Sequence, residues 1–387
     1  MNVNWTKSTL GDSLSLIRNG VNCKQDKSGI GDKISRIETI ASAQVNLERV
    51  GFSILTKEQK EKYKLQQGDI LFSHINSTVH VGKTAYIDDD YPLYHGINLL
   101  LIRAADNIDP GYLELFLRGL FWSGYWERIC KKSVNQASVN QTDIKKTPFQ
   151  YPPLEEQKQI VAKLDQCFEA IDKAKANATK NLENAKELFQ SKLNEIFSQK
   201  GEGWVEKKLG DVCKYDKNKN QSNNLPYIGL EHIESNSGRF IGSLDSHQVK
   251  SSTFHFDSRH VLYGRLRPYL NKVLIPNFEG HCSTEIFPIL VGNEIIREYL
   301  FYWLISDQTV KKIDATWTGA RMPRANMNEV INFILPIPQV EEQKQIVKLL
   351  GNLREQTQSL ESKYQQELNS LEELKKSILQ KAFEGEL

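Results

Sequence analysis

The heptapeptide "EEQKQIV" occurs at residues 155–161 and again at residues 341–347. The similarity continues well beyond it, because residues 152–197 align without a gap onto residues 338–383 at a constant spacing of 186. Self-similarity at a fixed spacing indicates a structural unit that the chain carries more than once. The heptapeptide is therefore expected to be one feature of a duplicated segment.

A second pair of similar stretches lies upstream. "WTKSTLGD" at residues 5–12 resembles "WVEKKLGD" at residues 204–211. Together with the repeated heptapeptide, these stretches bracket two copies, Trp5 to Phe197 and Trp204 to Phe383, joined by "SQKGEG" at residues 198–203. The sequence thus predicts one unit written twice.

The composition sets outer limits. A chain of 387 residues exceeds the size at which a single hydrophobic core stops growing, so more than one domain is expected. The net charge of +2 is too small to indicate a nucleic-acid partner by itself. The five cysteines have no metal-ligand or disulfide spacing. No apolar run approaches the ~20 residues of a membrane span and the start does not resemble a secretion signal, so a cytoplasmic protein is expected.

Each copy changes character once. Residues 1–151 and 201–337 mix short apolar runs with turn residues, which predicts an α/β (α+β) domain with a mixed sheet in each. Residues 152–200 and 338–387 instead carry apolar or small residues in steps of three and four, the pattern of a coiled-coil seam. The predicted seam residues are Ile160, Leu164, Ile171, Leu182, Leu188, Ile346, Leu350, Leu353, Leu360, Leu368, Leu371, Leu374 and Ile378.

Each seam predicts a long helix, about 65 Å in length at 1.5 Å per residue. A narrow apolar stripe on such a helix needs a partner helix, and the two copies are natural partners. Two similar units related by pseudo-two-fold symmetry would pair these helices antiparallel and hold the globular domains at opposite ends of a rod. A duplicated coiled-coil scaffold that binds only protein remains an alternative at this point, because many scaffolds are symmetric too.

Three stretches of the chain resemble a known family: "YPPLEEQKQIVAKLD" (151–165), "LPIPQVEEQKQIVKLL" (335–350) and the closing "ILQKAFEGEL" (378–387). The resemblance is to the specificity (S) subunits of type I restriction-modification systems. It extends to "TGARMPRANMNEVINFILPIP" (318–338) and its weaker counterpart "SVNQASVNQTDIKKTPFQYPP" (133–153). The order of domain, long helix, domain, long helix also fits this family.

The resemblance implies a role and a set of partners. Each globular domain would be a target-recognition domain that reads one half of a bipartite site in double-stranded DNA. The antiparallel helices would set the gap between the half-sites and dock two methyltransferase (M) subunits, with endonuclease/translocase (R) subunits completing the complex. S-adenosylmethionine, ATP and Mg²⁺ would be bound by those partners, and this chain would be neither an enzyme nor a cofactor- or metal-binding protein.

The residues themselves offer few catalytic motifs. "VGKT" at residues 81–84 lacks the first glycine of a phosphate-binding loop, because Ser77 stands there. "YPPL" at residues 151–154 lacks both the amide and the aromatic ring that would hold a flipped base. His74, His80 and His95 lie close in sequence, but a polar surface or a DNA contact is favoured over a metal site, because no carboxylate stands at ligand spacing. A self-sufficient methyltransferase or nuclease is therefore disfavoured.

Clusters of cations and amides mark the expected DNA contacts, since cations bind phosphates and amides and arginines read bases. "GDILFSHIN" at residues 68–76 aligns with "RHVLYGRLR" at residues 259–267, so different side chains occupy matching places and an asymmetric target is expected. Solvated lysines, and a structural pair of Glu285 with Arg265 or Arg267, are the alternatives. The candidates are His74, Asn76, Lys83, Lys131, Lys132, Gln136, Lys217, Lys219, Arg265, Arg267, Tyr269, Lys272, Arg321 and Arg324.

Overall fold

The structure is a computed structural model. It describes residues 5–134, 136–199, 201–219, 224–242, 249, 251–319 and 321–386. The joint at residues 198–203 and the lysine-bearing loop at residues 214–224 therefore fall partly outside the described residues. No helix among the described residues combines the length and the apolar character that crossing a bilayer requires.

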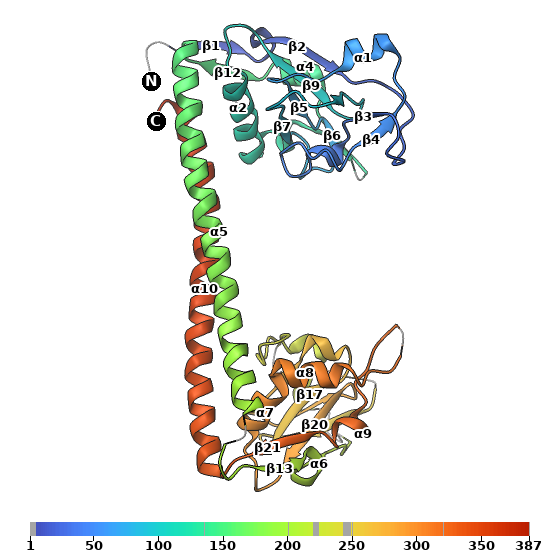
Figure 1. Ribbon diagram of the computed structural model, residues 1–387, viewed down its shortest axis with the longest axis vertical. Helices are drawn as coiled ribbons and strands as arrows, with labels where there is room; N and C mark the ends of the chain where they lie inside the picture. The colour runs from blue at the N-terminus through green and yellow to red at the C-terminus, as the bar shows by residue number, and fades with distance from the viewer. Residues whose placement is uncertain are drawn as a thin grey trace. The chain divides into compact units, whose positions relative to one another are not determined.

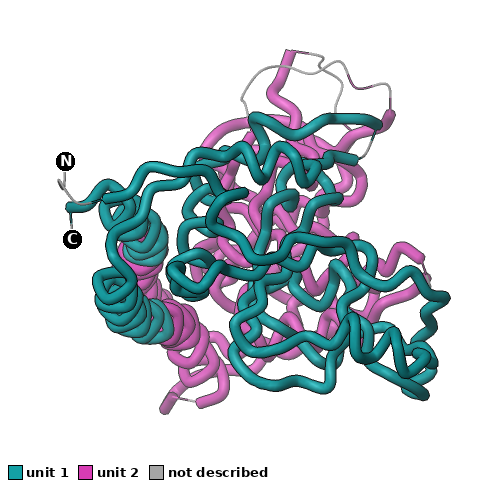
Figure 2. Tube along the Cα trace, turned by 90° about the horizontal axis from the view of Figure 1, so that it is seen from above, with its two compact units in different colours: residues 1–177, 367–387 teal, residues 178–366 magenta. Residues whose placement is uncertain are grey.

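The chain divides into two compact units, drawn in teal and magenta in Figure 2. Unit 1 comprises residues 1–177 and 367–387, and unit 2 comprises residues 178–366. Each unit therefore contains one globular domain and a part of both long helices.

The globular domain of unit 1 is built on an antiparallel sheet in the strand order β2-β9-β5-β7, with α2 packed against it (Figure 1). A smaller sheet, β4-β3-β8, contains a parallel β3-β8 pair, and β10-β11-β6 forms a third. The strands are β1 Thr6–Thr9, β2 Leu14–Asn19, β3 Asp32–Ile34, β4 Gly51–Ser53, β5 Ile70–Phe72, β6 Ile75–Asn76, β7 Thr84–Tyr86, β8 Leu93–Tyr94, β9 Leu100–Ala104, β10 Lys131–Ser133, β11 Gln136–Ser138 and β12 Pro148–Tyr151. The helices of this domain are η1 Gly11–Ser13, η2 Ile37–Ile40, α1 Lys57–Tyr63, α2 Pro110–Trp122, α3 Tyr125–Ile129 and α4 Gln141–Lys145.

The globular domain of unit 2 repeats this plan. Its main antiparallel sheet has the order β14-β20-β17-β18, and its smaller sheet, β15-β19-β16, contains a parallel β15-β19 pair. The strands are β13 Val205–Lys208, β14 Cys213–Tyr215, β15 Tyr227–Ile228, β16 Thr253–Phe256, β17 His260–Gly264, β18 Val273–Leu274, β19 Gly280–Ser283, β20 Ile286–Val291 and β21 Ile334–Ile337. The helices are α6 Leu209–Val212, η3 Leu230–His232, η4 Pro268–Leu270, α7 Arg297–Ile305, α8 Asp307–Asp314 and α9 Met327–Val330. The predicted mixed-sheet α/β class is confirmed in both copies.

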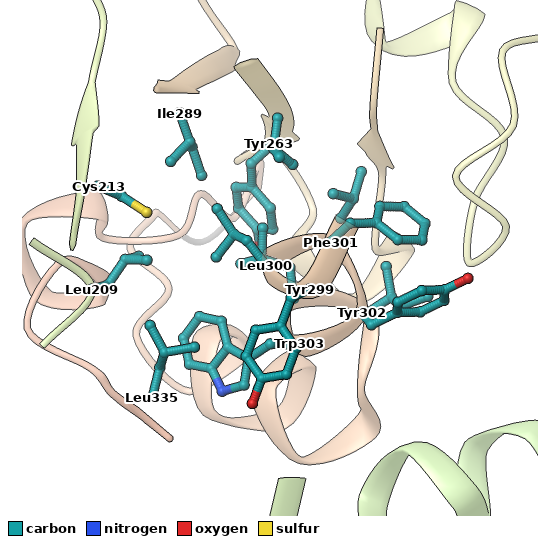
Figure 3. Packing of buried hydrophobic residues seen from close by; sticks show 14 of the residues in the cluster. Leu209, Cys213, Tyr263, Ile289, Tyr299, Leu300, Phe301, Tyr302, Trp303 and Leu335 are labelled. Atoms are coloured by element: carbon teal, nitrogen blue, oxygen red, sulfur yellow. The ribbon is translucent and has the colours of Figure 1, made fainter. Parts of the chain in front are cut away.

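The core of unit 2 gathers around α7, which is buried on all sides. Tyr299, Leu300, Phe301, Tyr302 and Trp303 pack with residues of β17, β20 and β21, as Figure 3 shows for Tyr263, Ile289 and Leu335. A helix that is apolar all round belongs in the interior of a domain. The sheet and α7 thus form the packed base of the domain, from which the loops at the strand ends extend.

The long helices are α5 Leu154–Ser198 and α10 Val340–Glu384. In unit 1, Lys175 forms an ion pair with Glu372, and Asp172 forms one with Lys375. The two helices therefore run antiparallel. In unit 2, Leu193 of α5 and Leu350 of α10 are buried in one core cluster. The helices lie side by side within each unit (Figure 1), which confirms the predicted antiparallel coiled coil.

Three of the predicted seam residues do not face the helix pair. Leu188 is 51% exposed, Leu374 is 46% exposed and Leu360 is 37% exposed. The seam residue that follows Ala185 is Phe189, four positions on, and not Leu188, three positions on. Phe189 packs on Tyr302 at a ring-centroid distance of 6.3 Å. The placement of these three leucines in the seam was therefore wrong.

The second helix makes the same step at the matching place. Lys375 takes the position expected for Leu374, where its ammonium group lies 2.7 Å from Asp172 and 4.9 Å from the ring centroid of Phe168. Leu188 and Leu374 are 186 residues apart, so the change of step is itself duplicated.

The repeated heptapeptide attaches each domain to its helix through a buried glutamine. In unit 1, the Gln157 side chain accepts from the Asp109 N–H at 2.8 Å and donates to the carbonyls of Asn107 at 3.1 Å and Pro152 at 2.9 Å. Gln157 is 0% exposed, so these bonds satisfy polar groups that water does not reach.

Unit 2 repeats this attachment. The Gln343 side chain accepts from the Ile296 N–H at 2.9 Å and donates to the carbonyls of Glu294 at 2.8 Å and Pro338 at 2.9 Å. Beside each glutamine, a glutamate of the heptapeptide accepts from a tryptophan indole: Glu156 from Trp5 at 3.1 Å, and Glu342 from Trp204 at 2.8 Å. The anchors recognised in the sequence thus touch each other in both copies.

Candidate nucleic-acid interface

A hairpin of unit 1 carries three of the candidate DNA contacts. Strands β10 and β11 pair so that Lys132 opposes Ala137, and β11 continues onto β6 by pairing Ala137 with Asn76. Lys131, Lys132 and Gln136 are exposed on this hairpin. An exposed hairpin with two cations and an amide has the side chains that contact phosphates and base edges.

Unit 2 carries a matching hairpin between α8 and α9, which projects from the domain in Figure 1. Thr318 and Arg324 close it with reciprocal backbone hydrogen bonds of 3.0 and 3.1 Å. The backbone of Arg324 also forms an isolated β-bridge with Leu266. Gly319 has a φ of 94°, which glycine adopts without strain. Arg321 is exposed on this hairpin.

The two hairpins occupy the same place in their domains. The Val139 N–H donates to the His74 carbonyl at 2.9 Å, and the Ala325 N–H donates to the Arg265 carbonyl, also at 2.9 Å. Val139 and Ala325 are 186 residues apart, and His74 aligns with Arg265. The residues after β5 and β17 and the two hairpins therefore form equivalent surfaces with different side chains.

His74 is not on the surface. Its exposed fraction is 7%, and burial lowers the pKa of its imidazole below the ordinary value. Its carbonyl accepts from the Val139 N–H, so the backbone at His74 is joined to the segment that follows the hairpin. The prediction that His74 contacts DNA was wrong because the residue is buried.

Asn76 remains on the surface, but both ends of its amide are engaged. Its nitrogen donates to the Ser73 hydroxyl at 3.1 Å, and its oxygen accepts from the Ser77 N–H at 2.8 Å. These bonds hold together residues 73–77, the segment that contains β6.

Lys83 and Lys272 align as expected, since their carbonyls accept from Ser73 and Gly264 at 2.8 Å. Their ammonium groups are also equivalent, because they donate to the carbonyls of Ala41 and Leu230, each at 2.7 Å. Burial lowers the pKa of Lys83. Both lysines therefore hold segments of their own domains together.

Arg265 and Arg324 share one carboxylate. Glu285 lies 3.0 Å from the Arg265 Nε and 2.9 Å from an Arg324 terminal nitrogen. Burial alone would raise the pKa of Glu285, but hydrogen bonds from Arg324 and Arg265 outweigh it and hold the pKa below the ordinary value. The alternative of a structural pair between Glu285 and Arg265 is thus confirmed.

Arg265 and Arg267 do not lie on one strand face. β17 ends at Gly264, and Arg267 has a φ of 52°, which turns the chain into η4. Arg267, Tyr269 and Arg321 are exposed and make no side-chain hydrogen bond or ion pair with the described residues. These three side chains are therefore available for DNA contact in unit 2.

Lys217 and Lys219 follow β14 and are exposed. The Lys217 ammonium lies 4.9 Å from the ring centroid of Phe287, and the Arg265 guanidinium lies 5.3 Å from the same centroid. Lys217 and Arg265 therefore share the Phe287 ring, and the backbone of Lys219 forms an isolated β-bridge with Phe254.

A groove of about 410 Å³ in unit 1 is lined by Asn76 together with other polar, charged and apolar side chains. Lys27 and Arg36 contribute cations to it, and Glu38 pairs with both, at 3.5 and 3.0 Å. The sequence singled out Asn76 and Lys83 as DNA contacts, and His80 as a residue of a polar surface or a DNA contact. The other lining residues include Lys27, Arg36, Glu38 and Asn98, which come from separate parts of the chain and share no sequence pattern.

Comparisons with known proteins agree with this architecture. Residues 2–184 and 201–370 match the family model described as the type I restriction modification DNA specificity domain. A putative type I restriction enzyme MjaX specificity subunit of Methanocaldococcus jannaschii is 30% identical over 410 aligned residues, covering 99% of this chain and 93% of that protein. The EcoDI specificity subunit of Escherichia coli is 30% identical over 166 residues, covering 42% of this chain and 37% of that protein.

Solved structures share the fold. A chain from a structure concerned with complex assembly and conformational transition of the type I R-M system has a TM-score of 0.77 at 18% identity, covering 100% of this chain and 99% of that one. The HsdS subunit of Thermoanaerobacter tengcongensis has a TM-score of 0.61 at 18% identity, covering 100% and 98%. With both copies matched by the family model, the chain belongs to the family of type I restriction-modification DNA specificity subunits.

Proposed function

We propose that this chain recognises the DNA target of a type I restriction-modification complex, with each globular domain reading one half of a bipartite, asymmetric site. One observation carries the proposal: the same strand and hairpin framework presents different side chains in the two copies. The hairpin of unit 1 exposes Lys132 and Gln136, whereas the hairpin of unit 2 exposes Arg321. A shared framework with divergent contact residues is what two half-sites of different sequence require.

The coiled coil serves as the spacer between the half-sites and as the docking surface for two methyltransferase subunits. In this proposal the chain is not itself an enzyme. S-adenosylmethionine is bound by the methyltransferase subunits, and ATP and Mg²⁺ are bound by the endonuclease/translocase subunits. The family membership and the exposed outer faces of α5 and α10 support this assignment.

Methylation mapping tests the proposal. A host that expresses this chain with its methyltransferase subunit should acquire methylated bases at one bipartite asymmetric motif, and the motif should disappear when this chain is omitted. Methylation without any motif, or with an unchanged motif in the absence of this chain, would show that the chain does not recognise DNA. It would then be a scaffold that binds only protein.

A further inference from the structure

One position, just before the strand β9 in unit 1 and β20 in unit 2, carries an unpaired amide in one domain and an ion-paired carboxylate in the other. Phe72 of β5 pairs with Leu100 of β9, and Tyr263 of β17 pairs with Phe287 of β20. Because Phe72 aligns with Tyr263, the register makes Leu100 and Phe287 equivalent. Two residues before them stand Asn98 and Glu285, each just ahead of the central strand of its main sheet.

In unit 1 this position faces open space. Asn98 lines the groove beside Asn76, is exposed and makes no side-chain hydrogen bond with the described residues. Its neighbour Asn76 has both ends of its amide engaged. A free amide in an open groove can form two hydrogen bonds with the edge of an adenine.

In unit 2 the same position is closed by ion pairs. Glu285 accepts from Arg265 at 3.0 Å and from Arg324 at 3.0 and 3.1 Å. Arg265 aligns with the buried His74, and Arg324 is 186 residues from Ser138, so neither arginine has a cationic counterpart in unit 1. Glu285 therefore fixes the loop after β17 to the base of the hairpin, next to the unpaired Arg267 and Arg321.

We propose that Asn98 and Glu285 set the specificities of the two domains in different ways. Asn98 reads a base of the first half-site directly from the groove. Glu285 is a positioning residue, which holds Arg265 and Arg324 so that Arg267 and Arg321 reach the second half-site in one fixed arrangement. This inference rests on the proposed function and adds to it the residues that distinguish the half-sites.

The test is selection of duplexes from a random DNA library by the full chain in complex with its methyltransferase subunits. Asn98→Ala should reduce base discrimination about 5- to 100-fold at one or two positions of one half-site and leave the other half-site unchanged. Glu285→Gln should change the base preferences of the other half-site only. Glu285→Asp keeps the charge and should restore part of the original preference.

Matched controls are available in the loop between β20 and α7. Asn293→Ala removes an exposed amide, and Glu294→Gln removes an exposed ion pair with Lys207. Neither should alter the selected motif. Thermal unfolding of each complex checks that the variants fold, and Glu285→Asp replaces Glu285→Gln if the latter does not.

The outcomes separate the two proposals. A wild-type complex that selects no motif overturns the proposed function and this inference with it. A wild-type motif that Asn98→Ala leaves unchanged overturns the direct role of Asn98. Weaker binding of Glu285→Gln to all sequences, with unchanged base preferences, shows that Glu285 is only structural and overturns its positioning role.

Discussion

Single residues explain why the heptapeptide is repeated. The second glutamate accepts from a tryptophan indole, and the glutamine is buried at the junction between helix and domain. The repetition reflects the same attachment made twice. The neighbouring Gln159 of the same heptapeptide is exposed, so the seven residues are not equally important.

Substituting the buried glutamine should loosen the domain on its helix. Gln157→Ala leaves the Asp109 N–H and two carbonyls without their partner, which should reduce the free energy of unfolding of unit 1 by about 2 to 4 kcal/mol. Hydrogen exchange should rise in α2 and β12 and stay unchanged in unit 2. Gln159→Ala is the matched control, and equal effects of the two substitutions would contradict this assignment.

His95 should make the stability of unit 1 depend on pH. It is 0% exposed, and burial lowers the pKa of His95 from 6.5 to about 4. The unfolded chain therefore binds the proton more readily than the folded chain between these values. The free energy of unfolding should be highest above pH 6.5 and fall by about 3 kcal/mol as the pH drops to 4.

Urea unfolding measured across this pH range checks the prediction. His95→Gln, which retains a side-chain donor toward the Leu99 carbonyl but does not titrate, should remove most of the slope. His80→Gln is the control, because His80 is exposed. A slope that persists in His95→Gln would assign the effect to other groups.

Arg267 should read bases without supporting the fold. Its side chain is exposed and has no partner among the described residues, so Arg267→Ala should leave thermal stability unchanged. It should weaken recognition of one half-site about 5- to 100-fold, as loss of a two-point contact with guanine does. Methylation mapping gives the readout, and Arg259→Ala, which removes another exposed arginine of unit 2, should have no effect on the motif.

At the scale of elements, the sequence predicts structure where a pattern repeats along the chain. It does not predict which loops come together in space. Both long helices, most of the seam and the duplication follow from sequence periodicity and repetition. The step of four after Ala185 and Leu371 does not, because Phe189 is drawn to Tyr302 and Lys375 to Asp172, contacts that lie far apart in sequence. The groove with Asn98 was missed for the same reason.

The corrected seam makes a direct prediction. Phe189→Ala should destabilise unit 2 by about 2 kcal/mol, because it removes a half-buried ring from the core. Leu188→Ala should change stability by less than about 0.5 kcal/mol, since Leu188 faces solvent. Guanidinium unfolding of the two variants decides between the registers, and the opposite ranking would restore Leu188 to the seam.

At the scale of the whole molecule, the helix pair should act as a ruler. Inserting one heptad at matched points of α5 and α10 preserves the seam, because seven residues restore the facing positions. The methylated motif should then keep both half-site sequences and change only in the number of bases between them. Altered half-site sequences with a constant gap would contradict the role of the helices as a spacer.

The division of the chain into units also has a consequence for biosynthesis. Phe383, near the end of α10, packs on Tyr112 and Phe116 of α2 at ring-centroid distances of 5.0 and 5.4 Å. Unit 2 is continuous over residues 178–366, whereas unit 1 needs residues 367–387. A growing chain therefore presents every residue of unit 2 before unit 1 is complete. The domain that leaves the ribosome first is therefore the last to acquire its full core, and the apolar surface of α2 stays uncovered by Phe383 until the end of α10 has been made.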